Sequence, residues 1–293
     1  MRHTPPYEQR VIGFVDILGF GQLVADSESD GEKFRLIHCV LEKINQVEDV
    51  YGSPEDLFAH SNYASLSDNF KKELDAVFDK MRAKAQPTRV TVTTFSDSIV
   101  FSSPASSAGL ANFRYFLIKL LAHTNSFQLL LRGGISCGSL VHTEQMIFGP
   151  AMNQAYYLES KVAKNPRIVV DEDFETLVEK LEDQSLASLI RSELVRQHAS
   201  LEAHFDTLSL ATNKVAQNMC KANAYEILVN EKITIESLMR GAPSDPNIMS
   251  KLYWYVSYYN DFLERTREVE VVVSQMCGMP LETIMVPITD LRI

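Results

Sequence analysis

A short buried strand that ends at an acidic residue is the feature that most restricts how this chain can fold. The run Val11-Ile-Gly-Phe-Val15 is apolar, contains β-branched residues and leads directly into Asp16, so it predicts a strand that carries a carboxylate at its end. Apolar residues then recur at alternating spacings of three and four between about 31 and 47, which predicts an amphipathic helix. A strand followed by such a helix favours a sheet with helices packed against it.

The same alternation continues to about residue 172. The segment 89–101 is typical of a β-hairpin with Ser96 and Asp97 at its turn, whereas 49–86 interrupts the order as a surface insertion. Further elements are expected as a helix over 108–122, a strand over 128–136, a helix over 151–163 and a strand over 167–170. This order predicts an α/β fold of the α+β sandwich kind, in which helices cover one face of a mixed sheet.

The C-terminal part has a different pattern. Helical periodicity extends over 174–182, 186–204 and 248–267, with strand-like stretches at 224–229 and 268–273. We therefore expect a core over 1–172 and a mainly helical extension over 173–293, which packs on this core or on a dimer partner.

Net charge and cysteine usage argue against several classes of protein. The chain has 28 basic and 38 acidic residues, a formal net charge of −10, which disfavours a broad binding surface for nucleic acid or anionic lipid. The four cysteines are scattered and lack the spacing of a zinc site. The N-terminus lacks the apolar stretch of a signal peptide, and no run approaches the roughly 18 apolar residues of a membrane span. We expect a cytoplasmic protein with reduced thiols that binds neither nucleic acid nor a membrane.

Two acidic residues at strand ends give the first indication of function. Asp16 ends the first predicted strand, and Asp97 lies at the tip of the predicted hairpin. Two carboxylates on neighbouring strand ends are suited to binding Mg²⁺ or Mn²⁺ that carries a polyphosphate. Each aspartate taken alone is equally compatible with a role in stabilising a turn.

Four motifs that include these residues resemble class III nucleotidyl cyclases, the family of adenylate and guanylate cyclases. Phe14-Val-Asp16-Ile-Leu-Gly-Phe20 resembles the first metal-binding motif of that family, and Phe95-Ser-Asp97 resembles the hairpin with its second metal-binding aspartate. Leu131-Arg-Gly-Gly-Ile-Ser-Cys-Gly138 is similar to the strand whose arginine binds triphosphate. The segment from Phe148 to Ser160 is similar to the catalytic helix. The motifs occur in the order of the family and cover residues from about 11 to 172.

The resemblance implies a homodimer that cyclises a nucleoside triphosphate at sites shared between its subunits. Asp16 and Asp97 of one subunit would bind two Mg²⁺ or Mn²⁺ ions per site, with the carbonyl of Ile17 as a further ligand. One ion would lower the pKa of the ribose 3′-hydroxyl, and the other would neutralise the triphosphate.

The remaining motif residues would bind the substrate. The resemblance implies that Arg132 holds the β- and γ-phosphates and that Asn153 is supplied by the other subunit. Backbone amides would surround the phosphate oxygens; these are the amides of Leu18, Gly19, Phe20 and Gly21.

One position of the catalytic helix departs from the family pattern. Four residues after Asn153, the family has an arginine that stabilises the charged transition state, and this chain has Tyr157. Lys161, one further turn along the same face, is the candidate replacement. A solvated surface lysine is the alternative explanation for Lys161.

The positions that read the base also differ. Purine cyclases use a polar pair, one residue four positions before the second metal-binding aspartate and one seven positions before the asparagine, and these positions are Thr93 and Met146 here. Neither purine pattern is reproduced, because each purine would leave polar edge groups unpaired. This mismatch, the insertion and an expected single catalytic domain without an attached sensor together resemble the bacterial pyrimidine cyclases of Pycsar antiphage systems. That similarity implies cyclic UMP or cyclic CMP as the product, with UTP favoured as substrate, and a separate effector that responds to it.

Two other interpretations remain open at this stage. One is an adenylate cyclase with an unusual base pocket, and the other is a catalytically silent cyclase-like domain that binds nucleotide or only dimerises. The presence of Asp16, Asp97 and Arg132 together argues against the silent domain, because an inactive scaffold has no need of these charges. The histidines, including His142 and His204, share no spacing and are expected to be structural.

Overall fold

The computed structural model describes residues 6–45, 65–85, 88–196, 202–220, 222–241 and 246–266. Eight strands within these ranges form one sheet. They are β1 (Glu8–Ile17), β2 (Thr91–Phe95), β3 (Ser98–Pro104), β4 (Leu131–His142), β5 (Ile147–Phe148), β6 (Ile168–Val170), β7 (Leu194–Val195) and β8 (His204–Phe205).

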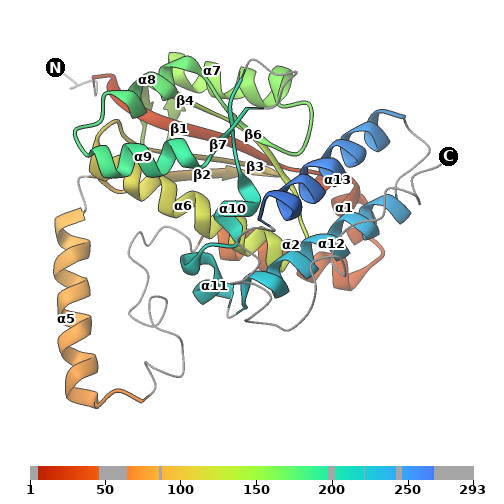
Figure 1. Ribbon diagram of the computed structural model, residues 1–293, viewed down its shortest axis with the longest axis horizontal. Helices are drawn as coiled ribbons and strands as arrows, with labels where there is room; N and C mark the ends of the chain where they lie inside the picture. Colours follow the sequence, from red (N-terminus) through yellow and green to blue (C-terminus); the bar gives the residue numbers. More distant parts are fainter. Residues whose placement is uncertain are drawn as a thin grey trace.

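The sheet is mixed. Its strands follow the order β2-β3-β1-β4-β6-β8-β7, and β5 pairs with the end of β4. β4 and β6 run parallel, while the other pairs are antiparallel. Helices pack against this sheet (Figure 1), which confirms the predicted fold class.

The helices of the N-terminal half are α1 (Phe20–Ser27), α2 (Gly31–Asn45), α5 (Asp68–Ala85), α6 (Ser107–Ser126), α7 (Pro150–Tyr157) and the π-helical turn η3 (Leu158–Val162). Those of the C-terminal half are α8 (Glu172–Glu179), α9 (Gln184–Ser192), α10 (Thr207–Ala211), α11 (Lys214–Cys220), α12 (Ala224–Gly241) and α13 (Pro246–Thr266). None of the helices in the described ranges combines the length and apolarity needed to cross a bilayer.

Alternate residues of β1 serve two separate cores, because successive side chains of a strand point to opposite faces. Val11, Val15 and Ile17 belong to the larger core, which α6 shares. Ile12 and Phe14 belong to a smaller core under α7. Figure 1 accordingly shows α6 and α7 on opposite sides of the sheet, so the prediction that helices cover only one of its faces is wrong. The end of β1 therefore lies between two packed layers.

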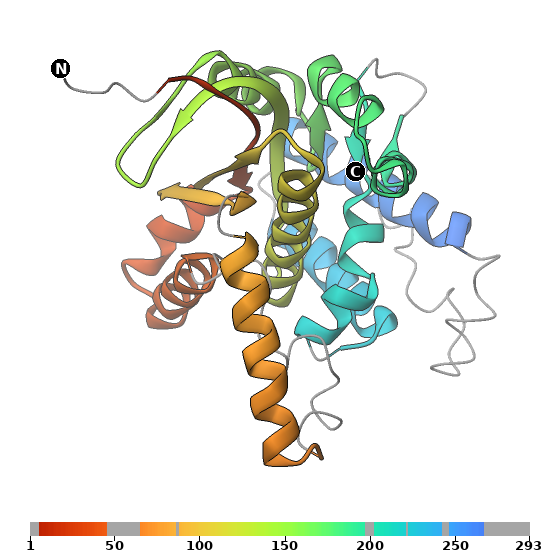
Figure 2. The ribbon, with the colours of Figure 1, turned by 90° about the vertical axis from the view of Figure 1, so that its left-hand side faces the viewer.

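The predicted insertion contains one described helix. α5 projects from the rest of the molecule in Figures 1 and 2. The preceding residues 46–64 lie outside the described ranges.

The prediction of one helix over 186–204 is wrong. α9 ends at Ser192, and the strands β7 and β8 then extend the sheet. The chain leaves the helix at Glu193, because the side chain of Glu193 pairs with Arg114 of α6 and its carbonyl accepts from the Asp206 amide at 2.8 Å. These partners are distant in sequence, so helical periodicity does not reveal them.

The prediction of a strand over 224–229 is also wrong, because this segment begins α12. Asn223 Oδ1 accepts from the Glu226 amide at 3.0 Å, and Glu226 Oε2 accepts from the Asn223 amide at 2.8 Å. This reciprocal capping box marks a helix start and was visible in the sequence. The strand predicted at 268–273 lies outside the described residues.

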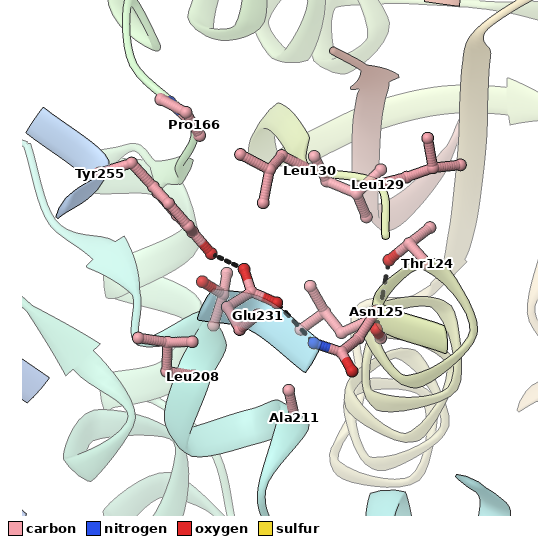
Figure 3. A pocket seen from close by; sticks show the side chains of 12 residues that line it. Thr124, Asn125, Leu129, Leu130, Pro166, Leu208, Ala211, Glu231 and Tyr255 are labelled. Carbon is pink, nitrogen blue, oxygen red and sulfur yellow. Dashed lines mark hydrogen bonds between the residues drawn. The ribbon is translucent and has the colours of Figure 1, made fainter. Parts of the chain in front are cut away.

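The C-terminal helices pack directly on the sheet core. Glu231 of α12 accepts hydrogen bonds from the Tyr255 hydroxyl of α13 and from the side-chain amide of Asn125 of α6 (Figure 3). Burial raises the pKa of the Glu231 carboxyl. These three residues and Leu130 help to line a cavity of about 30 Å³, which is room for about one water molecule. Helices α12 and α13 thus pack against α6 through a buried polar cluster.

Candidate functional site

The strand register gathers the predicted acidic and basic residues at one end of the sheet. Asp16 of β1 lies opposite Ser98 of β3 on one side and opposite Arg132 of β4 on the other. The hairpin tip between β2 and β3 is tied to the end of β1, because the Ile17 amide donates to the Asp97 carbonyl at 3.2 Å. The two aspartates and Arg132, which are far apart in sequence, therefore meet in the fold.

The Asp16 and Asp97 carboxyl groups face each other closely enough to share a hydrogen bond. Burial, this hydrogen bond and the charge of Asp97 raise the pKa of Asp16 to about 7, with a further rise from Glu159. Arg132 acts in the opposite direction and lowers it. Two carboxylates held this close repel each other when both are ionised.

This donor pair fits a divalent cation. A cation between two hard oxygen donors would remove their repulsion, and carboxylates are the protein ligands that Mg²⁺ and Mn²⁺ prefer. Among the described residues, no group of three or more His, Cys, Asp or Glu side chains is arranged to hold a metal ion. Mg²⁺ commonly takes only one or two carboxylates and completes its shell with waters and substrate phosphates. The pair of Asp16 and Asp97 is suited to that mode of binding.

Arg132 is held between two carboxylates. Its Nη2 lies 3.2 Å from Asp16 Oδ2 and also pairs with Glu159 Oε1 of η3. Its Nε is buried without a hydrogen-bond partner within the described part of the chain. Glu159 is only 4% exposed, and sequence reasoning did not assign it a role. Its position in the Leu-Glu-Ser segment of the fourth motif was the available signal.

A glycine of the third motif lets α7 and η3 approach the sheet. A Cβ added at Gly134 would lie 2.4 Å from the Leu158 Cβ and 2.5 Å from the Ala155 carbonyl oxygen. Only glycine allows this contact without displacing the backbone of α7 and η3. The close approach brings Glu159 next to Arg132.

The predicted helix over 151–163 is α-helical only to Tyr157 and continues as η3. It runs antiparallel to β4, because Ala151 lies near Gly138 while Leu158 lies over Gly134. Asn153 precedes Glu159 by six positions, which is about 9 Å along a helix at 1.5 Å per residue. Asn153 is therefore offset from the Asp16 end of the sheet, although both lie on the α7 side.

The predicted transition-state position faces solvent. Asn153 and Lys161 are exposed, and Tyr157 is 53% exposed. Phe95 and Tyr156 are also exposed, and each packs edge-on against Phe14, at ring-centroid distances of 6.2 and 5.3 Å. An exposed aromatic group therefore borders the aspartate pair.

The loop after Asp16 supplies fewer free amides than predicted. The Leu18 amide donates to the Leu130 carbonyl at 2.9 Å, so it is already paired. Gly19 has φ 77°, a left-handed conformation that favours glycine, and it caps α1, which begins at Phe20. The space beside an added Cβ at Gly19 or Gly21 is open. The amides at the start of α1 remain candidates for phosphate contact.

The two predicted base-reading positions are linked by a histidine that sequence reasoning treated as structural. Thr93 Oγ1 lies 3.0 Å from His142 Nε2. His142 ends β4 and pairs with Ile147 of β5, next to Met146, which is 50% exposed at the turn. Figure 2 shows this β4–β5 hairpin, in light green, arching away from the body of the sheet.

No protein-family model and no curated protein matches this sequence. Solved structures do show similarity. A bacterial light-regulated adenylyl cyclase is 15% identical over 73% of this chain and 96% of that chain, with a TM-score of 0.36. The monomeric guanylyl cyclase domain of the RhoGC fusion protein from the aquatic fungus Blastocladiella emersonii is 16% identical over 68% of this chain and 94% of that chain, with a TM-score of 0.37. The catalytic core of a rhodopsin-guanylyl cyclase with converted specificity, in complex with ATPαS, is 13% identical over 68% of this chain and 94% of that chain, with a TM-score of 0.36.

These neighbours are adenylyl and guanylyl cyclases, the family that the four sequence motifs resemble. With TM-scores of 0.36–0.37 and identities of 13–16%, this similarity determines neither the fold nor the function of this chain. The chemistry of this chain is inferred from its own residues.

Proposed function

We propose that this protein is a metal-dependent nucleotidyl cyclase. The observation that carries the proposal is the convergence of Asp16, Asp97 and Arg132 at one end of the sheet. A carboxylate pair for cations beside a guanidinium for phosphates is the set that triphosphate chemistry requires. A turn-stabilising role for each aspartate does not account for two carboxyl groups that meet at one place, where burial, their shared hydrogen bond and the charge of Asp97 together raise the pKa of Asp16.

In the proposed reaction, the ribose 3′-oxygen bonds to the α-phosphorus. The bond from that phosphorus to the bridging oxygen breaks, the hydroxyl proton is lost and pyrophosphate leaves. Asp16 and Asp97 would hold the divalent cations, which when bound supply Lewis-acid activation and charge neutralisation. Arg132 would exchange a carboxylate partner for phosphate oxygens, and Asn153 would orient the ribose.

The active species is proposed to be a homodimer. Asn153 is offset along α7 from Glu159, the partner of Arg132, which supports a site in which Asn153 comes from the second protomer. Several aromatic side chains on this side of the protein are 44–55% exposed. They are Tyr7, Phe95, Phe148, Tyr156 and Tyr157. A second copy would cover them and contribute the missing half. Lys161 remains the candidate cation for the transition state.

The favoured substrate is UTP, and CTP is the second choice. Thr93 and Met146 lack the polar pattern of either purine pocket, which supports a pyrimidine. By its likeness to Pycsar cyclases, the product would be a second messenger for an antiphage effector. The alternative is an adenylate cyclase with an unusual base pocket, and the assay described next distinguishes the two.

The test is to incubate the purified protein with equimolar ATP, GTP, CTP and UTP, with Mn²⁺ or Mg²⁺, and to identify cyclic products by mass. Cyclic UMP is expected to dominate, with pyrophosphate released in equal amount. Asp97→Asn is the inactive control. Dominant cyclic AMP or cyclic GMP would remove the pyrimidine assignment, and no cyclic product from a folded dimer would remove the cyclase assignment.

A further inference from the structure

A continuous chain of hydrogen bonds lies behind the proposed base-reading residue Thr93. Arg10 Nε donates to Ser102 Oγ at 2.9 Å, Ser102 Oγ lies 2.8 Å from His142 Nδ1, and His142 Nε2 lies 3.0 Å from Thr93 Oγ1. Arg10, Ser102 and His142 are buried, whereas Thr93 is partly exposed. The chain begins at a permanent cation and ends at a hydroxyl that borders solvent.

The direction of each hydrogen bond follows from Arg10. A guanidinium only donates, so Ser102 Oγ accepts from Arg10 and its own proton needs another acceptor. Ser102 is 0% exposed, which excludes solvent, and an unpaired buried proton would cost about 1–3 kcal/mol. His142 Nδ1 is the acceptor at hydrogen-bond distance.

The His142 imidazole then sets the direction of the hydrogen bond to Thr93. Burial and the charge of Arg10 lower the pKa of His142 to about 4, so its ring is neutral near pH 7. A neutral ring that accepts at Nδ1 carries its proton on Nε2 and donates it to Thr93 Oγ1. Because that bond occupies an acceptor site of the Thr93 oxygen, the Thr93 hydroxyl proton is directed away from His142.

We propose that this series of hydrogen bonds directs the Thr93 hydroxyl proton toward the base and thereby selects UTP over CTP. The inference rests on the proposed cyclase function. Uracil and cytosine share a carbonyl at position 2 and differ at positions 3 and 4. Uracil has an N3–H donor and an acceptor oxygen at position 4, whereas cytosine has an acceptor nitrogen at position 3 and an amino group at position 4, and Thr93 is proposed to meet position 4. The Thr93 hydroxyl proton pairs with the position-4 oxygen of uracil, whereas the cytosine amino group leaves that proton without an acceptor and competes for the one remaining acceptor site of the Thr93 oxygen. Arg10, Ser102 and His142 are positioning residues, since they act through Thr93.

The tautomer of His142 provides a test that does not depend on activity. Long-range ¹H–¹⁵N correlation spectra distinguish imidazoles protonated on Nε2, on Nδ1 or on both. At pH 7, His142 is expected to be neutral and protonated on Nε2, with its signals assigned by their loss in His142→Phe. Protonation on Nδ1, or on both nitrogens, overturns the proposal.

Kinetics test the consequence for the base. Thr93→Val removes the hydroxyl at nearly constant volume, and His142→Phe keeps a ring without its nitrogens. Each is expected to lower the ratio of kcat/KM for UTP to that for CTP by about tenfold or more, the equivalent of one lost contact, chiefly through the KM for UTP. Thr93→Ser is expected to restore the ratio. The double variant is expected to lose no more than either single variant.

A purely structural role of His142 predicts a different result, since a general disturbance would weaken both substrates equally and leave the ratio unchanged. The matched control is Ser139→Ala, which removes the Gln9–Ser139 hydrogen bond of 3.0 Å elsewhere on β4 and should leave the ratio unchanged. An unchanged ratio in both Thr93→Val and His142→Phe, or a wild-type preference for CTP, refutes the inference and leaves the cyclase proposal standing. Absence of any cyclic product would refute the cyclase proposal, while the tautomer measurement would still decide the hydrogen-bond polarity.

Discussion

Replacing Asp16 by asparagine is expected to stabilise the fold and abolish turnover together. The Asp16 carboxyl is partly buried and faces Asp97. When no divalent cation is bound, the burial and the neighbouring carboxyl group both disfavour the ionised form of Asp16. Asparagine keeps the shape, removes the charge and can still hydrogen-bond to Asp97. The same substitution takes away one of two carboxylates proposed to hold the cations, so the reaction should stop.

The size of the stabilisation follows from the proton affinity of Asp16. The pKa of Asp16 in the fold is about 7, against an ordinary value of 3.8 for an aspartate, and a tenfold change in proton affinity is worth about 1.4 kcal/mol. The upper bound is therefore about 4 kcal/mol, which partial exposure to water reduces to roughly 1–2 kcal/mol. For a protein of this size that is a rise in Tm of about 2–8 °C. Because the folded pKa is raised, the wild type bears no cost while Asp16 is protonated below pH 3.8, and the cost grows as the pH rises to about 7.

Differential scanning calorimetry in EDTA at pH 8 and at pH 4.5 measures this effect. Asp16→Asn should melt above wild type at pH 8, and the difference should shrink at pH 4.5. Added Mn²⁺ should raise the Tm of wild type more than that of the variant. Asp26→Asn is the matched control, since Asp26 is paired with Lys33 at 2.5 Å and its pKa is lowered, so its loss should not stabilise. A variant that melts at or below wild type at pH 8, or that keeps near-normal turnover, would refute the reasoning.

Three further predictions concern other parts of the molecule. Mixing Asp97→Asn with Asn153→Ala protomers should restore part of the activity, because one shared site is then intact; a mixture that stays inactive after confirmed subunit exchange rules out the shared site. Gly134→Ala should lower stability by about 1–3 kcal/mol, measured by urea unfolding, because its Cβ would lie 2.4 Å from the Leu158 Cβ; unchanged stability and activity would show that Gly134 does not set the helix position. For Glu231→Gln, the Tm difference from wild type should increase from pH 5 to pH 8, since burial raises the pKa of Glu231 and its ionised form costs stability as the pH rises; a pH-independent difference would contradict a titrating buried carboxyl.

Elements with strong local patterns were predictable from the sequence, and those set by distant contacts were not. β1, the β2–β3 hairpin, α6 and α13 correspond to clear apolar periodicity. β4 begins at Leu131 rather than at 128, because Gln128 turns the chain with a positive φ of 57°. The change from α7 to the π-turn η3 depends on packing over Gly134, which no local pattern encodes.

In the candidate site, too, some features were predictable from sequence motifs, while others depend on residues that are distant in the sequence. The motifs were sufficient to predict that Asp16, Asp97 and Arg132 meet, because strand register brings residues at the ends of paired strands together. The sequence predicts a structural role for His142 because the histidines share no spacing, and its partners Ser102 and Thr93 lie 40 and 49 positions away, so no local pattern reveals them. The amide of Leu18 was predicted to be free because its partner, the Leu130 carbonyl, is even more remote in sequence.

The C-terminal helices support the strand ends that carry the site. Leu130, which directly precedes β4, shares a buried cluster with Leu228 of α12 and Tyr259 of α13, and Leu18 packs against the same cluster. The hydrogen bond from the Leu18 amide to the Leu130 carbonyl then joins the residue that follows β1 to the residue that precedes β4. Asp16 and Arg132 each lie two positions from this link, so the position of one relative to the other depends on the packing of α12 and α13. The segment beyond residue 172 is therefore part of what holds the carboxylate pair next to its arginine, since the same apolar contacts that bury these helices also fix the two backbone segments of the site.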